Sequence, residues 1–120
     1  MSTALMDSLR REMMSARKRR DQVTVVACRS ALAAVANAEA VPSEESAGAV
    51  EQAKVGAGAA DAPRRELSEA EVRAIIAAHL AELDTSVAEY QQVGQPAAAE
   101  EVAAQAAALR QALPSSALPS

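Results

Sequence analysis

The chain has 120 residues, a length that suits one domain. Alanine is the most frequent of its hydrophobic residues, and Tyr90 is the only aromatic one. A β-sandwich or β-barrel would need β-branched and aromatic residues with frequent turn signals, so this composition excludes those folds. Alanine is the best helix former, and the sequence therefore predicts an all-α protein. The net charge of -4 shows that the chain as a whole lacks the basic character that is typical of nucleic-acid-binding proteins.

The first two helices are expected over residues 3–19 and 22–40. In the first, apolar side chains recur at helical spacing on one face: Leu5, Leu9, Met13 and Ala16. Asp21 is placed to act as the N-cap of the second. This second helix is apolar on most sides, as expected when a helix packs against several neighbours.

Residues 41–66 lose this pattern, because proline, glycine and serine interrupt a run of small and acidic residues. We expect a flexible loop there, since few large apolar side chains are available to offset the entropy of ordering. The third helix should begin at a capping box formed by Ser68 and Glu71 and run to residue 93. Its apolar stripe comprises Val72, Ile76, Leu80, Leu83, Val87 and Tyr90.

Gly94 should end the third helix and Pro96 should begin the fourth, which Pro114 terminates. The fourth helix carries a narrower stripe of Val102, Ala106, Leu109 and Leu113. Short connections predict two antiparallel helical hairpins that form a compact four-helix domain over residues 1–114. The long flexible loop joins the hairpins, and residues 115–120 are expected to be a disordered tail.

The sequence predicts no catalytic, cofactor-binding or metal-binding residues. Cys28 and His79 are the only cysteine and histidine, so neither a disulfide within the chain nor a transition-metal site is expected. Cys28 stands in an apolar run and should be a buried, unreactive thiol. No apolar segment is expected to be long enough to cross a membrane, and charges interrupt any N-terminal leader. We therefore expect a cytoplasmic protein with no membrane partner.

Positive charge is concentrated near the N-terminus. Residues 1–21 carry a net charge of +3, whereas the remaining residues carry -7. The run Arg17, Lys18, Arg19 and Arg20 has two interpretations. Cations are favoured at a helix C-terminus, and such a cluster also aids solubility; this is the interpretation we favour. Alternatively, these residues contact RNA phosphates or a partner, although no aromatic residue lies nearby to stack on bases.

Four strings in the sequence together resemble the GatB/YqeY family. They are RSALAAVANAEAV at 29–41, LSEAEV at 67–72, EYQQVGQPAAAE at 89–100 and ALRQALP at 108–114. The resemblance implies the N-terminal helical domain of a YqeY-like protein, similar to the tail of the B subunit of tRNA-dependent amidotransferase. Family members commonly continue into a second helical domain and carry more basic residues in the third helix. Both differences reduce the expectation of tRNA binding.

Three polar residues match the family signature in the second helix: Arg29, Asn37 and Glu39. Arg29 and Asn37 are eight residues apart and should lie near one helix face. We expect both to form hydrogen bonds with neighbouring helix ends or with the loop, because polar groups inside a bundle need partners. A ligand-facing role, implied by the resemblance alone, is the alternative.

The function expected from the resemblance is that of a non-catalytic accessory or adaptor domain. It would belong to amidotransferase systems and bind tRNA or an amidotransferase- or translation-related protein. The family label of glutamine-dependent carbon–nitrogen ligase is implied as well, but no residue here supplies that chemistry. The first alternative is a helical protein-interaction or homo-oligomerisation module unrelated to tRNA. An independent amidase or ligase ranks third.

Overall fold

Four helices account for the regular secondary structure of the residues that the structure describes, 4–40 and 66–114. In this computed structural model they are α1 (Ala4–Lys18), α2 (Gln22–Ala40), α4 (Glu69–Gln92) and α5 (Pro96–Ala112). The all-α prediction is confirmed, and each helix begins and ends within two residues of its expected position. The expected loop (41–66, apart from Glu66) and the expected tail (115–120) lie outside the described residues.

A tight turn reverses the chain between α1 and α2. The Asp21 N–H donates to the Ala16 carbonyl at 2.8 Å, and the Arg20 N–H donates to the Arg17 carbonyl at 3.2 Å. These two bonds define a Schellman motif, in which the residue after the helix is left-handed. Here that residue is Arg20, with φ 60°. The turn therefore places a cation where glycine is usual.

Asp21 caps the N-terminus of α2, as predicted. Its Oδ1 accepts a hydrogen bond from the Thr24 N–H at 3.2 Å, and its Oδ2 accepts one from the Thr24 hydroxyl at 2.7 Å. These hydrogen bonds, the hydroxyl bond above all, lower the pKa of Asp21. The cap satisfies a backbone donor that the first turn of a helix leaves unpaired.

The predicted capping box at the start of α4 is confirmed. The Glu71 N–H donates to Ser68 Oγ, and the Ser68 N–H donates to Glu71 Oε1, both at 3.1 Å. At the other end, Gly94 has φ 73° and its N–H donates to the Gln91 carbonyl. The Gln95 N–H bonds to the Tyr90 carbonyl, so the α4–α5 connection is a second Schellman motif.

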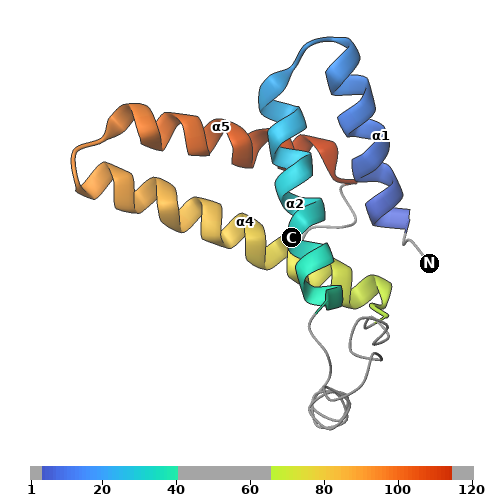
Figure 1. The fold of residues 1–120 in the computed structure, drawn as a ribbon. Helices are drawn as coiled ribbons and strands as arrows, with labels where there is room; N and C mark the ends of the chain where they lie inside the picture. Colours follow the sequence, from blue (N-terminus) through green and yellow to red (C-terminus); the bar gives the residue numbers. More distant parts are fainter. Residues whose placement is uncertain (1–3, 41–65, 115–120) are drawn as a thin grey trace, which may run out of the picture.

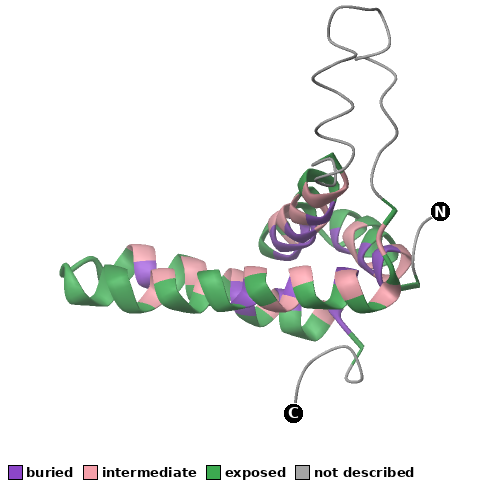
Figure 2. Ribbon diagram, turned by 90° about the horizontal axis from the view of Figure 1, so that it is seen from below, coloured by how far each residue is buried: buried purple, intermediate pink, exposed green. Residues whose placement is uncertain are grey.

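The two hairpins cross rather than lying parallel. Figure 1 shows α1 and α2 packed across one end of the α4–α5 hairpin, while the connection between α4 and α5 projects away from them. Helix α2 contacts all three other helices and is the centre of the fold. Buried residues gather where the hairpins meet (Figure 2). The most deeply buried large side chains are Leu9, Ile76, Leu109, Val35, Val72 and Cys28.

The crossing limits how much of the predicted α4 stripe reaches the core. Val72, Ile76 and Leu80 are buried, and Leu83 packs against the core from a partly buried position. Tyr90, at the projecting end, is 37% exposed. The stripe extends beyond the surface that α1 and α2 cover, so among the described helices its last turns pack against α5 alone.

Helix α2 corrects one expectation. By length and composition, its 19 residues are apolar enough to span a membrane. The same composition also fits the core helix of a bundle, and this helix does pack against three neighbours. Its buried residues are Thr24, Val25, Ala27, Cys28, Ala31 and Val35.

Candidate binding surfaces

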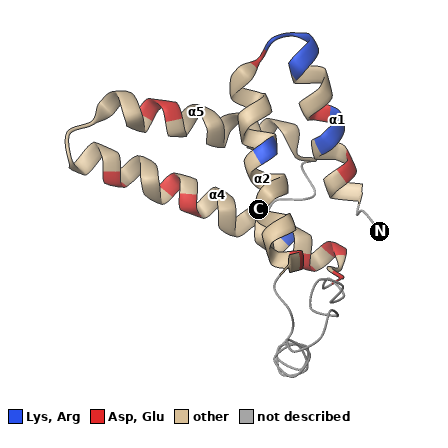
Figure 3. Ribbon diagram, viewed as in Figure 1, with Lys and Arg blue, Asp and Glu red and all other residues tan. Residues whose placement is uncertain are grey.

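The predicted basic run forms the last turn of α1 and the turn that follows. We call residues Arg17, Lys18, Arg19 and Arg20 the basic turn. All four side chains are exposed, and Figure 3 shows them together at one end of the α1–α2 hairpin. Acidic residues predominate on α4 and α5 (Figure 3). The structure thus separates positive and negative charge between the two hairpins.

Arg19 differs from its three neighbours because its guanidinium is bound within the fold. It donates to Glu12 Oε1 at 2.8 Å, to Ser15 Oγ at 3.0 Å and to Asp21 Oδ2 at 3.3 Å. These contacts, the hydrogen bond to Glu12 first, raise the pKa of Arg19. Arg19 therefore links α1 to the start of α2 through side-chain contacts within the fold.

The other three cations of the basic turn are available to a ligand. Arg17, Lys18 and Arg20 make no hydrogen bond or ion pair through their side chains with any residue in the described part of the chain. The side chains of all three residues are exposed, so an anion can reach them from solvent. An anion reaching this turn would meet three positive charges that have no ion-pair partner among the described residues.

A shallow basic hollow of about 350 Å³ extends this surface along α1. It is lined by Arg10, Arg11, Met14, Ser15 and Lys18. Met14 is 53% exposed within it, and Arg10 pairs with Asp7 at 3.3 Å. Arg10, Arg11 and Met14 were not predicted from the sequence to form a site. Helical spacing could have found them, because residues 10, 14 and 18 share one face of a helix.

The three polar residues predicted in α2, Arg29, Asn37 and Glu39, form no hydrogen bond with one another in the described part of the chain. Arg29 and Asn37 are exposed and Glu39 is half-buried. Within the described residues, none of the three forms a side-chain hydrogen bond, so the expected bonds from Arg29 and Asn37 to helix ends are not seen there. The expected contacts with the loop concern residues outside those described.

Cys28 and His79 occupy the interior or its edge. Burial raises the pKa of the Cys28 thiol to about 11, with Glu12 and Asp21 adding to the effect, so the reactive thiolate is suppressed. The structure confirms that Cys28 is buried. His79 is half-buried, and its Nε2 has no hydrogen-bond partner among the described residues. Those residues include no group of three His, Cys, Asp or Glu side chains that could hold a metal ion.

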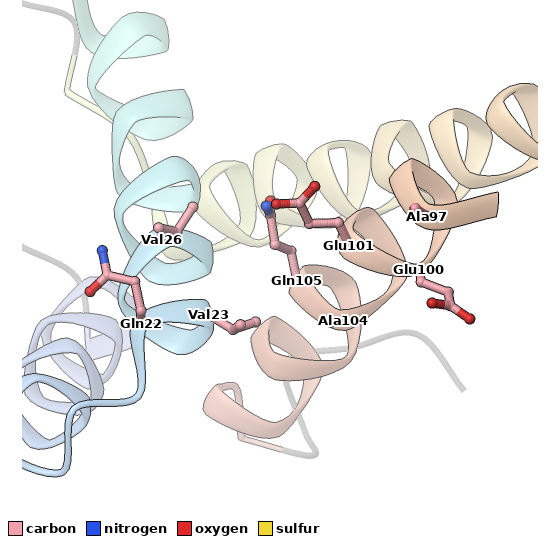
Figure 4. Close-up of a pocket in the computed structure, with 8 residues that line it drawn as sticks. All are labelled: Gln22, Val23, Val26, Ala97, Glu100, Glu101, Ala104 and Gln105. Carbon is pink, nitrogen blue, oxygen red and sulfur yellow. The ribbon is translucent and has the colours of Figure 1, made fainter. Parts of the chain in front are cut away.

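A groove of about 450 Å³ lies between the first turns of α2 and the outer face of α5. We call it the interhelical groove; Figure 4 shows the residues that line it, Gln22, Val23, Val26, Ala97, Glu100, Glu101, Ala104 and Gln105. Val23 points toward α5 near Ala104, whereas Glu100 and Glu101 leave α5 in different directions (Figure 4). Val23 is 42% exposed, so the centre of the groove is an open apolar surface.

The sequence did not reveal this groove, because its two walls lie about 80 residues apart along the chain. Val23 lies in the first turn of α2, and its sequence position does not distinguish it from the other apolar residues of that helix. Glu100 and Glu101, on the α5 wall, are both exposed.

No family model matches the chain, and no curated protein and no solved structure matches it either.

Proposed function

We propose that the protein acts by binding, as a non-catalytic accessory or adaptor domain of the GatB/YqeY type. It would serve tRNA-dependent amidotransferase or translation-related systems in the cytoplasm. The four sequence strings support the family, and the basic turn supports the mode of action. Arg17, Lys18 and Arg20 have no ion-pair partner in the described part of the chain, and three such cations at one end of an otherwise acidic molecule suit the backbone phosphates of tRNA.

The contact would be electrostatic and weakly selective for sequence. Arg17, Lys18 and Arg20 would each pair with a phosphate, and phosphate contacts position a protein without reading bases. Arg10, Arg11 and Lys18 around Met14 would extend the same surface along α1. With three phosphates neutralised, the log–log dependence of the binding constant on salt should have a slope of about -2 to -3.

Fluorescence anisotropy with labelled tRNA at low salt tests this proposal. The triple variant R17E/K18E/R20E should lose binding, while Arg19 is left intact because it holds the turn together. Single variants K18E and R20E should each weaken binding, and the matched control R73E, an exposed arginine on α4, should not. Circular dichroism checks that each variant is helical.

Two results would count against RNA binding: no anisotropy change for the native protein at low salt, or equal binding by the triple variant. A pull-down from lysate with and without nuclease then separates RNA from protein partners. Loss of all captured proteins on nuclease treatment would support an RNA-mediated role.

The interhelical groove favours a second candidate function, that of a helical protein-interaction or homo-oligomerisation module. Its evidence is the exposed Val23 between two helices with small alanine side chains opposite. This function needs no nucleic acid. Measurement of self-association of the purified protein in the absence of nucleic acid tests this function.

A further inference from the structure

The basic hollow on α1 has an apolar side chain between two groups of cations. Arg10 and Arg11 line one end of it, Lys18 lines the other, and Met14 lies between them. Residues four apart on a helix lie on the same face and are about 6 Å apart along its axis. The outer face of α1 is therefore positive, apolar and positive over successive turns.

The carboxylates of α1 do not neutralise both ends of this hollow. Helix α1 contains two acidic residues, Asp7 and Glu12. Asp7 pairs with Arg10 at 3.3 Å, and Glu12 accepts a hydrogen bond from Arg19 at 2.8 Å. Arg11 and Lys18 are exposed and have no ion-pair partner among the described residues. The hollow thus keeps a positive charge on each side of its apolar centre.

Met14 restricts the ligands that fit this hollow. RNA phosphates suit the cations, but a phosphate placed over a 53% exposed methionine would lose water without gaining a hydrogen bond. A membrane surface would need a wide apolar face. The other large apolar side chains of α1 do not supply one, since Leu5, Met6 and Leu9 are buried in the core. A fitting ligand has an apolar group between two negative charges.

We propose that the basic hollow binds an amphipathic helix of a partner protein, in which a carboxylate, an apolar side chain and a second carboxylate follow one another at steps of four residues. Such a helix lies along α1 with its apolar side chain on Met14, whose flexible thioether adapts to the shape of its neighbour. Its two carboxylates pair with Arg11 and Lys18. This partner is additional to the tRNA contact proposed above, which is centred on the basic turn.

A synthetic peptide serves as the probe. It is a dye-labelled, alanine-based helix with glutamate, leucine and glutamate at steps of four residues, added to the nuclease-treated full chain at low salt. We expect a saturable rise in fluorescence anisotropy, weakened by added salt because exposed charges are screened. Two matched peptides should not bind: one with the leucine moved to the opposite face, and one with lysine in place of both glutamates.

Substitutions in the hollow locate the site. Met14→Ser should raise the peptide dissociation constant roughly three- to tenfold through lost apolar burial. Lys18→Glu should raise it by roughly the same factor through charge reversal. Arg73→Glu on α4 and Val93→Ser at the projecting end, both exposed and remote from α1, are the matched controls and should leave it unchanged.

A charge exchange separates a lost contact from a misfolded variant. Of the two peptides in which a single glutamate is replaced by lysine, one should bind the Lys18→Glu variant more tightly than the original peptide does. A misfolded variant could not produce this rescue. Circular dichroism on each variant checks that helical content is unchanged.

The proposal is overturned if the probe does not bind the native chain, if the lysine peptide binds equally well, or if Met14→Ser and Lys18→Glu leave binding intact. It is also overturned if Met14→Ser weakens tRNA binding and not peptide binding, because the hollow would then belong to RNA. Arg20→Glu should weaken tRNA binding alone, since Arg20 does not line the hollow. Peptide binding by a chain that binds no tRNA would support this proposal and count against the tRNA contact.

Discussion

Arg20 and Gly94 occupy the same position in two copies of one turn motif. Each is the left-handed residue after a helix, with φ 60° and 73°, and each is flanked by the same pair of backbone hydrogen bonds. An L-residue in this conformation brings its Cβ close to a backbone carbonyl oxygen, at a cost of roughly 1–2 kcal/mol that glycine avoids. The α1–α2 turn retains a cation there, and the α4–α5 turn does not.

Exchanging these residue types should change stability in opposite directions. Arg20→Gly should raise the free energy of unfolding by up to about 1 kcal/mol, because relief of strain exceeds the added entropy of the unfolded chain. Gly94→Ala should lower it by about 0.5–1 kcal/mol. Apart from Gly94 and its two neighbours in the chain, no atom lies within 4 Å of the position that a Cβ would take, so the loss would come from the backbone conformation and not from a clash with other residues. Urea titration of dilute protein at moderate salt measures both; a stabilised Gly94→Ala variant would contradict the account.

Substitutions along α4 should become less costly toward the projecting end. Leu80→Ala should destabilise the protein by about 2–4 kcal/mol, because Leu80 is only 5% exposed and its loss leaves a cavity. Leu83→Ala should cost less, and Tyr90→Ala should change stability by about 0.5 kcal/mol or less. Thermal and urea unfolding of the three variants would test this order. Equal losses at Leu80 and Tyr90 would show that the whole stripe is packed.

The helices were predictable because their ends depend on local chemistry. The capping box at Ser68, the N-cap at Asp21 and the stop at Gly94 are each specified by a few neighbouring residues. The crossing of the hairpins was not predictable, because periodicity identifies the apolar face of a helix but not what covers it. Tyr90 fits the stripe as well as Leu80 does, and only the placement of α1 and α2 distinguishes them.

Removing the capping box should weaken α4 at its start. Ser68→Ala should lower the free energy of unfolding by about 1 kcal/mol, since the Glu71 N–H loses its acceptor. Thr85→Ala, at an exposed position within α4, serves as the control and should have little effect. Unfolding curves measured side by side give the difference. An unchanged free energy of unfolding in the Ser68→Ala variant would indicate that the first turn of α4 contributes nothing to stability.

Cys28 should be unreactive in the folded protein and should make stability fall in alkali. The folded thiol has a pKa of about 11, whereas an unfolded cysteine ionises at a pH of about 8.5. The contribution of the un-ionised Cys28 thiol to the free energy of unfolding is therefore fully present below the pKa of the unfolded cysteine. That contribution is lost as the pH rises toward about 11. Urea titrations at rising pH should show a fall that the Cys28→Ala variant lacks. A thiol-reactive dye should label the native chain only after unfolding, and rapid labelling without urea would contradict this.

The basic turn was only partly predictable from sequence. Four contiguous cations are obvious in the chain, but the use of Arg19 to bind Glu12, Ser15 and Asp21 depends on the path of the turn. The interhelical groove could not be inferred, because Val23 and Ala104 become neighbours only when α2 crosses α5. Local charge is visible in a sequence, whereas a surface shared by distant segments is not.

The projecting end of the α4–α5 hairpin has a consequence for how the molecule opens. Near the connection at Gly94, α4 and α5 pack only against each other among the described helices, and Ala99 is buried there while Val93 is 68% exposed. Segments with few buried contacts open with less free energy than the global unfolding requires. Amide protons near Tyr90 should therefore exchange with solvent through local separation of the two helices, while those near Ile76 should exchange only when the whole molecule unfolds.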